Sequence, residues 1–404
     1  MVVWRVFLLC VVLAGCATER LGDANQLITR QVRAPGALEN QRATFSAKLE
    51  QRILRKIDAA ARSGRGPGTL DFLVLSGGGE YGAFGVGILQ GWPDKGPLGR
   101  PDFDVVTGIS TGGLIAPFAF LGTEDSITHI DSIYRHTDRK FATLRDMLFF
   151  LPWRESFYDN STMRERVHGE ANESLARGVA SAYDEGRLLL IGTTNIDLGR
   201  MRIWDYGLES HKALESGNYA RMGDILMASA AIPAVFPPVQ INGEAYVDGG
   251  VSQQAFLGFD LEQLGEIVQS VKRKRPHARM PAMRIWVIVN GPLDDMGEMV
   301  TTGWGSVAKR SIDVLMHYSM RVTLRHLQFG AALLAAQGEI PVEFRYVSVP
   351  NEFPRREPSD VLFDADYMAK LNALGRQISA NPAIWRSTVG AVERLDAQIG
   401  TAHE

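Results

Sequence analysis

Residues 103–121 read FDVVTGISTGGLIAPFAFL, and the expected architecture of the chain follows from them. Residues 103–106 form a short apolar run typical of a buried strand, and residues 114–121 are typical of a helix. Between them lies Gly108-Ile109-Ser110-Thr111-Gly112, a G-x-S-x-G turn in the strand–helix context that this motif requires. The glycines permit a sharp turn, and the following helix adds partial positive charge beside the serine hydroxyl. We therefore predict that Ser110 is a nucleophile.

Strand-like and helix-like segments alternate on both sides of this stretch. Apolar runs rich in leucine or β-branched residues predict strands at 70–75, 187–194, 284–289 and 342–349. Helical patterns occupy 83–92, 224–231, 305–336, 364–378 and 383–397. Buried strands whose apolar residues do not alternate, set between helices, indicate a parallel sheet covered on both faces. The predicted class is α/β, with three layers and a largely parallel central sheet.

A glycine-rich block, Gly77-Gly78-Gly79-Glu80-Tyr81-Gly82, lies between a predicted strand and a predicted helix. It also satisfies the dinucleotide-binding pattern G-x-G-x-x-G, which requires an acidic residue about 20 positions later, at the end of the next strand. Asp102 and Asp104 precede that strand, so the dinucleotide interpretation fits poorly. Successive glycines at the start of a helix can instead direct backbone N–H groups toward an ester oxygen under attack. The block therefore predicts an oxyanion hole.

A serine hydroxyl needs a base, which is usually histidine. None of the eight histidines falls on a predicted strand-end loop. His317 and His326 lie among apolar residues of a long predicted helix, and they are the candidate bases of a Ser-His-Asp esterase. The sequence Tyr246-Val247-Asp248-Gly249-Gly250 places a carboxylate at a strand end, before two glycines. Alone, this Asp-Gly pair would be only a turn signal.

The three blocks, in this order, resemble the patatin-like phospholipase family. The stretch ASAAIPAVFP at 228–237 and the residues Thr193-Thr194-Asn195 to Gly199-Arg200 are similar to the same family. The resemblance covers about residues 70–251 and implies the patatin-like α/β/α fold. It also implies a catalytic dyad without histidine, in which Ser110 attacks, Asp248 is the direct base, and Gly77, Gly78 and Gly79 are the oxyanion donors.

Tyr81 departs from the resemblance, because the family commonly carries Arg or Lys at this position of the glycine loop. Loss of that cation weakens the case for an anionic headgroup. We expect a lipid acyl hydrolase of the phospholipase A or lysophospholipase type that forms an acyl-serine intermediate. The alternatives are a Ser-His-Asp esterase, a thioesterase or neutral-lipid esterase with the same dyad, and a non-catalytic envelope lipoprotein that binds lipid or a partner.

The amino terminus combines Arg5, an apolar run at 6–14, and Leu13-Ala14-Gly15-Cys16. The run is shorter than the roughly 20 residues that span a bilayer, and it has the length of a signal-peptide core. The tetrapeptide resembles the lipobox of bacterial lipoproteins, which implies cleavage before Cys16 and acyl chains on that residue. An ordinary secretory signal is the alternative. We expect a lipid-anchored protein of the bacterial envelope, at the outer membrane and facing the periplasm.

We expect a signal peptide at 1–15, a tether at 16–37, a helical segment at 38–68, a catalytic domain at 69–350 and a helical extension at 351–404. Phe45, Leu49, Ile53 and Ile57 recur every fourth residue and predict the helix. The net charge of -3 provides no excess of positive charge that would bind a polyanion, so nucleic acid is not an expected partner. No motif points to a cofactor or a metal ion. The apolar residues at 144–153 are interpreted as core packing in preference to an acyl pocket or a membrane contact.

Overall fold

The computed structural model describes residues 24–94, 96, 98–135, 143–144, 156, 158–294, 297, 299–356 and 362–389. The strands are β1 (Thr69–Leu75), β2 (Val105–Ile109), β3 (Thr143–Leu144), β4 (Tyr158–Asp159), β5 (Leu188–Asn195), β6 (Arg200–Asp205), β7 (Val239–Ile241), β8 (Glu244–Asp248), β9 (Ala282–Pro292) and β10 (Val342–Val349). The helices are α2 (Ala24–Ser63), α3 (Gly82–Gly91), α4 (Thr111–Leu121), α5 (Glu124–Arg135), α6 (Ser161–Glu170), α7 (Glu173–Asp184), α8 (Tyr206–Ser216), α9 (Ala220–Ser229), α10 (Leu261–Lys274), α11 (Trp304–Ala336) and α12 (Ala365–Ser379). Short 3-10 turns lie at Gly79–Tyr81, Gly249–Val251 and Pro382–Ile384.

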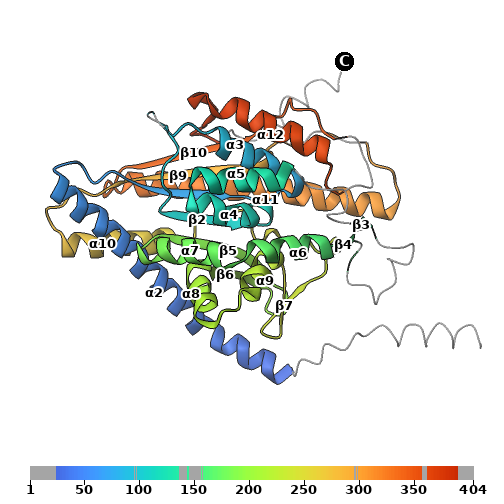
Figure 1. The fold of residues 1–404 in the computed structure, drawn as a ribbon, viewed down its shortest axis with the longest axis horizontal. Coiled ribbons are helices and arrows are strands. Elements are labelled where there is room, and N and C mark those ends of the chain that lie inside the picture. Colours follow the sequence, from blue (N-terminus) through green and yellow to red (C-terminus); the bar gives the residue numbers. More distant parts are fainter. Residues whose placement is uncertain are drawn as a thin grey trace, which may run out of the picture.

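One twisted sheet organises the described part of the chain (Figure 1). Its strands follow the order β10-β9-β1-β2-β5-β8-β7, and β6 pairs with β5 outside this path. Neighbours from β10 to β5 are parallel, whereas β6, β7 and β8 join by antiparallel pairing. The predicted α/β class with a largely parallel sheet is confirmed.

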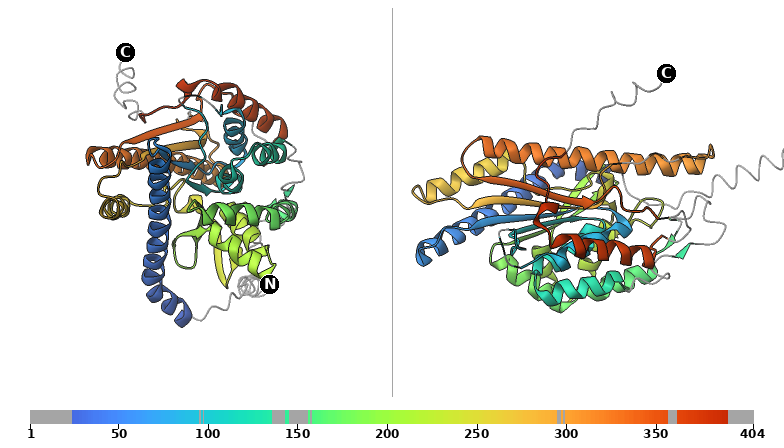
Figure 2. Two further views of the ribbon diagram at one scale, coloured as in Figure 1. Left: turned by 60° about the vertical axis from the view of Figure 1, so that its left-hand side comes forward. Right: turned by 90° about the horizontal axis from the view of Figure 1, so that it is seen from above.

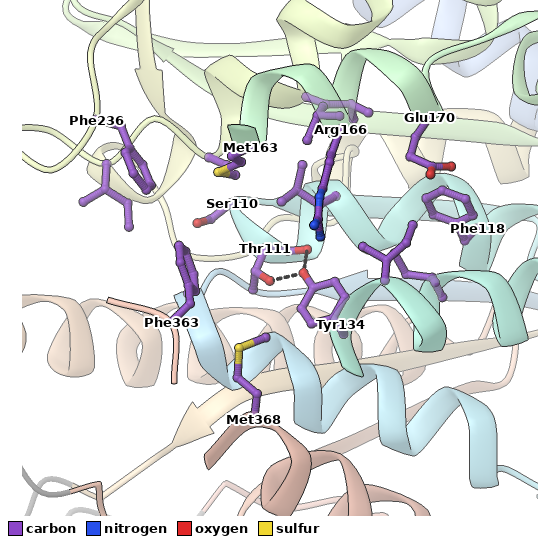
Figure 3. Close-up of a pocket in the computed structure, with 18 of the residues that line it drawn as sticks. Ser110, Thr111, Phe118, Tyr134, Met163, Arg166, Glu170, Phe236, Phe363 and Met368 are labelled. Atoms are coloured by element: carbon purple, nitrogen blue, oxygen red, sulfur yellow. Dashed lines mark hydrogen bonds between the residues drawn. The ribbon is translucent and has the colours of Figure 1, made fainter. Parts of the chain in front are cut away.

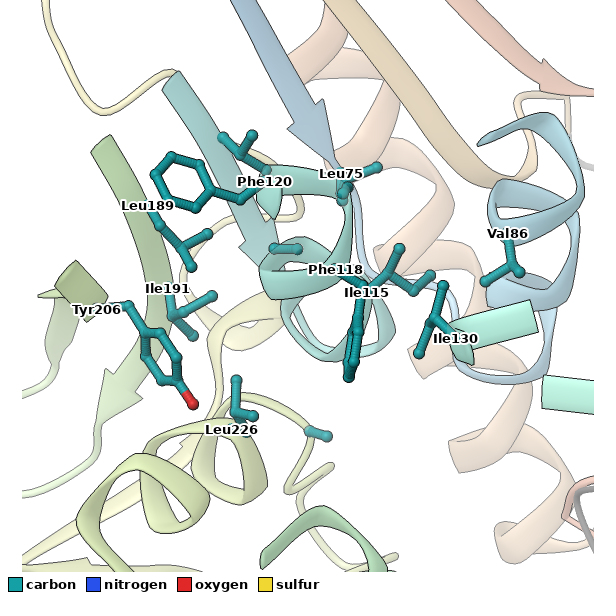
Figure 4. Packing of buried hydrophobic residues seen from close by; sticks show 14 of the residues in the cluster. Leu75, Val86, Ile115, Phe118, Phe120, Ile130, Leu189, Ile191, Tyr206 and Leu226 are labelled. Atoms are coloured by element: carbon teal, nitrogen blue, oxygen red, sulfur yellow. The ribbon is translucent and has the colours of Figure 1, made fainter. Parts of the chain in front are cut away.

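Helices cover both faces of the sheet because its central strands are apolar on both sides. Leu73 and Leu75 of β1 face a core formed with α3, α4, α5, α9 and α12, part of which is drawn in Figure 4. Phe72 and Val74 face the opposite core, to which α2, α10 and α11 contribute. Figure 2 shows these two helical layers on opposite sides of the strands. Burial on both faces is the usual condition of a parallel sheet.

Helix α2 confirms the predicted helix but begins earlier. Phe45, Leu49, Ile53 and Ile57 are all buried, as their fourfold spacing predicts. The helix starts at Ala24, so it includes most of the stretch 16–37 that the sequence predicts to be a tether. Pro35 lies within this helix, since a proline can remain inside a helix at the loss of one backbone hydrogen bond.

The predicted helix at 383–397 is wrong over its described part. A 3-10 turn at Pro382–Ile384 leads into Arg386, whose N–H and carbonyl both bond to Tyr346 of β10, at 2.9 and 2.8 Å. This bridge to the sheet edge replaces the bonds that a helix would make. Residues 390–404 lie outside the described residues. In the part of the chain that is described, no helix combines the length and apolarity needed to cross a bilayer.

Candidate active site

Ser110 occupies a strained turn between β2 and α4. Its φ and ψ of 56° and −128° lie in a region that residues other than glycine rarely adopt. A Cβ on Gly108 would come 2.4 Å from the carbonyl oxygen of Gly112, and one on Gly112 would come 2.4 Å from that of Leu75. Both glycines are therefore required for the turn. The predicted strand–turn–helix context of Ser110 is confirmed.

Ser229, the last residue of α9, holds the main chain at Ser110 in place through hydrogen bonds. Its hydroxyl accepts a hydrogen bond from the Ser110 N–H at 3.0 Å and donates one to the carbonyl oxygen of Gly192, in β5, at 2.8 Å. The Ser229 side chain is fully buried. It ties the strained backbone to the neighbouring strand. The sequence showed this serine within the 228–237 stretch but gave no sign of this role.

Asp248 ends β8 and reaches the same place from an antiparallel strand. Ile109 of β2 is in register with Gly192 of β5, and the next residue of β5, Thr193, is in register with Asp248. Ser110 follows Ile109, so Ser110 and Asp248 occupy one row of the sheet on either side of β5. Their side chains form a hydrogen bond, and each residue is 5% exposed. The structure brings together the serine and the aspartate that the sequence selected.

The surroundings of the Asp248 carboxyl hold its pKa above the ordinary range. Burial raises this pKa to about 6, while hydrogen bonds from the Ser110 side chain and from the Gly250 N–H, the latter at 2.7 Å, act in the opposite direction. The Asp248 main chain is also held: its N–H donates to Ala231 at 2.9 Å, and its carbonyl oxygen accepts from the Thr194 hydroxyl at 2.9 Å. The carboxyl is therefore a fixed group that is ionised at neutral pH.

The glycine turn lies beside Ser110, but its first N–H is already used. A Cβ on Gly77 would be 3.3 Å from that of Ser110, whereas the Gly77 N–H donates to the carbonyl oxygen of Gln254 at 3.1 Å. The prediction of an oxyanion hole from three glycines is therefore wrong for Gly77 in this conformation. Within the described part of the chain, the N–H groups of Gly78 and Gly79 have no acceptor. The carbonyl oxygen of Gln254, a residue that no sequence motif identified, thus accepts the hydrogen bond from the first of the three N–H groups.

Gly78 and Gly79 need to be glycine for different reasons. A Cβ on Gly78 would be 1.8 Å from the carbonyl oxygen of Asn290, and the φ of Gly79 is 56°. The turn therefore depends on a close approach at one glycine and a left-handed conformation at the other.

An apolar cavity of about 400 Å³ opens at Ser110. Figure 3 shows Ser110 at its wall, with Phe236 and Phe363 toward one end and Phe118 toward the other. At the amino-terminal end of α4, the Thr111 hydroxyl and the Tyr134 hydroxyl share a short hydrogen bond. Large apolar side chains from several helices supply most of the wall, among them Leu114, Phe118, Ile130, Met163, Leu226 and Phe236. Individually these residues resemble core positions, so no sequence pattern could identify them as cavity lining.

Two charged residues of α6 also line the cavity. Arg166 is exposed to solvent and reaches into the cavity from α6 (Figure 3). Glu170, one helical turn later, bonds to the ring of His129 at 2.7 Å. The cavity therefore combines an apolar interior with a charged edge.

The candidate histidines lie elsewhere. His317 lines a separate cavity of about 180 Å³ on the other side of the glycine turn, and His326 lines one of about 590 Å³ between α2 and α11. Neither of these histidines, nor any other described one, is among the residues that line the Ser110 cavity. Three of the others pair with carboxylates: His129 with Glu170, His168 with Asp224, and His211 with Asp184.

Tyr81 also points away from the Ser110 cavity. Its ring meets that of Tyr367 edge to face at 5.9 Å, and the two hydroxyls lie 3.4 Å apart. Tyr81 lines the smaller cavity that contains His317. Tyr81, at the position where the resemblance implies a cation, is thus part of the packing between the glycine turn and α12.

These features coincide with a match to a known family. Residues 73–257 match the patatin-like phospholipase model. The matched span includes the glycine turn, Ser110 and Asp248. A curated relative, the cGAMP-activated phospholipase of Pseudomonas aeruginosa (strain BWHPSA011 / Pa011), is 25% identical over 203 residues, which are 48% of this chain and 57% of the relative. The chain thus spans little more than half the length of that relative.

Among solved structures, human GIVD cytosolic phospholipase A2 in complex with methyl gamma-linolenyl fluorophosphonate matches with a TM-score of 0.30 and 12% identity. That match covers 85% of this chain and 63% of the human chain. The family model and the Pseudomonas relative are both described as phospholipases.

Two predicted features lie outside the described residues. They are Cys16 with the preceding signal peptide, and most of the apolar stretch 144–153. The lipid anchor, and the interpretation of that stretch as core packing, stay predictions.

Proposed function

We propose that this patatin-like chain is a phospholipase A or lysophospholipase that cleaves acyl esters through a Ser110–Asp248 dyad. The observation that carries the proposal is the hydrogen bond between these two buried side chains at the wall of an apolar cavity. A cavity of this kind suits an acyl chain, because apolar surface is removed from water along its length.

In the proposed reaction, Ser110 Oγ attacks the carbonyl carbon of the ester as its proton passes to the Asp248 carboxylate. The Gly78 and Gly79 N–H groups stabilise the oxygen that becomes negative, and each such donor contributes about 3–4 kcal/mol in comparable sites. The C–O bond to the leaving alcohol then breaks, and Asp248 returns the proton to that oxygen. Water, deprotonated by Asp248, attacks the acyl-Ser110 ester, and the fatty acid leaves as Ser110 regains its proton.

Arg166 gives a reason to propose a phospholipid in preference to an uncharged ester. The sequence offers Tyr81 in place of a cation in the glycine loop, but the folded chain supplies a guanidinium from α6 to the same cavity as Ser110. Guanidinium groups bind phosphate oxygens through paired hydrogen bonds. We propose that Arg166 contacts the substrate phosphate while the acyl chain occupies the apolar interior.

The experiment is fluorophosphonate labelling together with turnover of a short acyl ester and of a phospholipid. Wild-type protein should be labelled on Ser110 and should hydrolyse both substrates, whereas Ser110→Ala should do neither. Asp248→Asn should lose turnover, while His317→Ala and His326→Ala should retain it. A folded wild-type chain that is neither labelled nor active would indicate a lipid- or partner-binding protein instead. Loss of activity on a histidine change, with Asp248→Asn still active, would overturn the dyad.

We also propose that the mature protein is anchored in the bacterial envelope through acylated Cys16, at the outer membrane and facing the periplasm. The support is the lipobox-like sequence that ends at this cysteine. Mass spectrometry of the mature amino terminus should find acyl chains on Cys16. An unmodified amino terminus at another residue would contradict the anchor.

A further inference from the structure

Helix α11 exposes a stripe of large apolar side chains. Leu315 is 69% exposed, Val322 65% and Phe329 67%, and Tyr318 also lies in the stripe. These four residues are three, four and seven positions apart along the chain. This spacing places them on one side of a helix. Apolar residues that are exposed singly need no explanation, but a continuous row on one element indicates an interaction surface.

The stripe is not needed to hold α11 on the protein. A different side of the helix, with Met320, Leu324 and Leu327, is buried in the core shared with α2 and α10. In addition to its packed side, α11 therefore presents an apolar side to solvent.

Positive charge accompanies the exposed stripe. Helix α11 contains Lys309, Arg310, Arg321 and Arg325 but a single acid, Asp313, so its net charge is +3 (four cations minus one anion) in a chain of net charge -3. The three arginines are 11 and 4 positions apart, a spacing that aligns them along the helix beside the stripe. Arg321 is 17% exposed and pairs with Asp294, an exposed acid from the preceding loop, at 3.4 Å. An apolar row bordered by cations is the pattern of helices that lie on anionic membranes.

The stripe begins at the end of the molecule where Ser110 lies. Strand β9 is parallel to β1, which is parallel to β2, so α11 starts beyond the same sheet edge at which Ser110 follows β2. The 33 residues of α11 extend about 50 Å, compared with about 36 Å for the 11 residues of β9. Figure 2 shows α11 running along the molecule and projecting past the strands.

We infer that the amino-terminal two thirds of α11, Val307 to Phe329, docks on the surface of an anionic lipid bilayer. This inference rests on the proposed function, because the bilayer would carry the ester substrate to the edge of the sheet at which Ser110 lies. A second copy of the chain fits this surface less well. Two stripes packed together would bring arginine rows of equal sign into one interface, whereas anionic headgroups provide the opposite charge.

The test is sedimentation with vesicles of phosphatidylcholine alone and of phosphatidylcholine with about one third phosphatidylglycerol, because cationic surfaces bind anionic bilayers preferentially. The full chain carries Cys16→Ser throughout, so that no lipid anchor contributes. The test variant is Leu315→Glu with Val322→Glu. The control is Leu208→Glu, since Leu208 is 39% exposed on α8, away from α11.

Wild-type protein and the Leu208 control should bind the anionic vesicles, and binding should weaken as salt is added. The double variant should bind at least about tenfold less, because it replaces two inserted apolar groups by charges that the bilayer repels. It should keep the wild-type urea midpoint and hydrolyse the soluble short ester at the wild-type rate, because neither residue lines the Ser110 cavity.

Equal vesicle binding by the double variant and wild type would overturn the docking surface, as would failure of wild type to bind anionic vesicles. If wild type is a dimer by analytical ultracentrifugation, the double variant is a monomer, and neither binds vesicles, the stripe is a contact between copies. Binding is measured without turnover, so an inactive wild type that binds vesicles would refute only the proposed catalysis.

Discussion

Replacing Asp248 by asparagine should inactivate the protein and stabilise it at the same time. Burial raises the pKa of the Asp248 carboxyl from 3.8 to about 6, so the folded state disfavours its charge. This difference between the two pKa values corresponds to about 3 kcal/mol of folding free energy, because each pKa unit is worth about 1.4 kcal/mol. Above the folded pKa the protein carries this full penalty, since Asp248 is ionised in both the folded and the unfolded chain. Asparagine is uncharged and avoids it.

The sign of the pH dependence distinguishes this effect from a simple packing change. Between about pH 4 and pH 6 the folded state binds a proton that the unfolded state does not, so the penalty grows as pH rises through this window. Asp248→Asn should therefore gain stability at neutral pH and lose that gain toward pH 4. The asparagine Oδ1 can still accept the Gly250 N–H, but its bonds are weaker than those of a carboxylate. We expect a net gain of about 1–3 kcal/mol at neutral pH.

The assay is urea unfolding of wild type, Asp248→Asn and Ser110→Ala at neutral pH and near pH 4. Ser110→Ala is the matched control, because it removes the proposed nucleophile but keeps the buried charge, and it should be inactive without becoming more stable. Ester turnover by Asp248→Asn should fall by about 10²–10⁴-fold, the usual contribution of a general base. A folded Asp248→Asn protein that is less stable than wild type at neutral pH would refute the reasoning. So would a gain of equal size at both pH values.

Three further outcomes are expected. The kcat/KM for a soluble ester should rise with pH through about 6 as Asp248 ionises, and His317→Ala should leave this limb in place; a limb that disappears with the histidine would contradict the assignment. Ser229→Ala should lower kcat by about 10–100-fold with little change in KM, because the braced Ser110 turn relaxes, and Ser229→Thr should partly restore kcat. Arg166→Gln should lower kcat/KM for an anionic phospholipid by about tenfold relative to an uncharged ester. Arg164→Gln, which alters an exposed residue of the same helix paired with Asp224 at 3.3 Å, should change neither.

Local sequence patterns predicted the parts of this fold that depend on neighbouring residues. The strand–turn–helix around Ser110 follows from two glycines and two apolar runs, and the buried strands follow from their composition. The helix with Phe45 and Leu49 follows from its fourfold spacing. These features need no knowledge of what lies on the other side of the sheet.

The errors arose where distant residues decide the outcome. Arg386 joins β10 through main-chain bonds to Tyr346, so the predicted helix at 383–397 does not form where the chain is described. The Gly77 N–H is taken by a carbonyl oxygen 177 positions later in the chain, at Gln254. The cavity wall is equally non-local, because Met163 and Phe236 become lining residues only when α6 and the segment before β7 meet near Ser110.

The antiparallel strand β8 explains how Asp248 comes to lie against Ser110, as the proposed dyad requires. If β8 ran parallel to β5, its last residue would lie at the carboxyl edge of the sheet, among the loops that follow the parallel strands. Because β8 runs the opposite way, its last residue points back into the sheet, in the row of Thr193 next to the end of β2. There Asp248 is buried enough for its pKa to rise to about 6, yet it remains ionised at neutral pH. The same placement makes the carboxylate more basic and sets it against Ser110, and these are the two properties that the proposed dyad requires of its base.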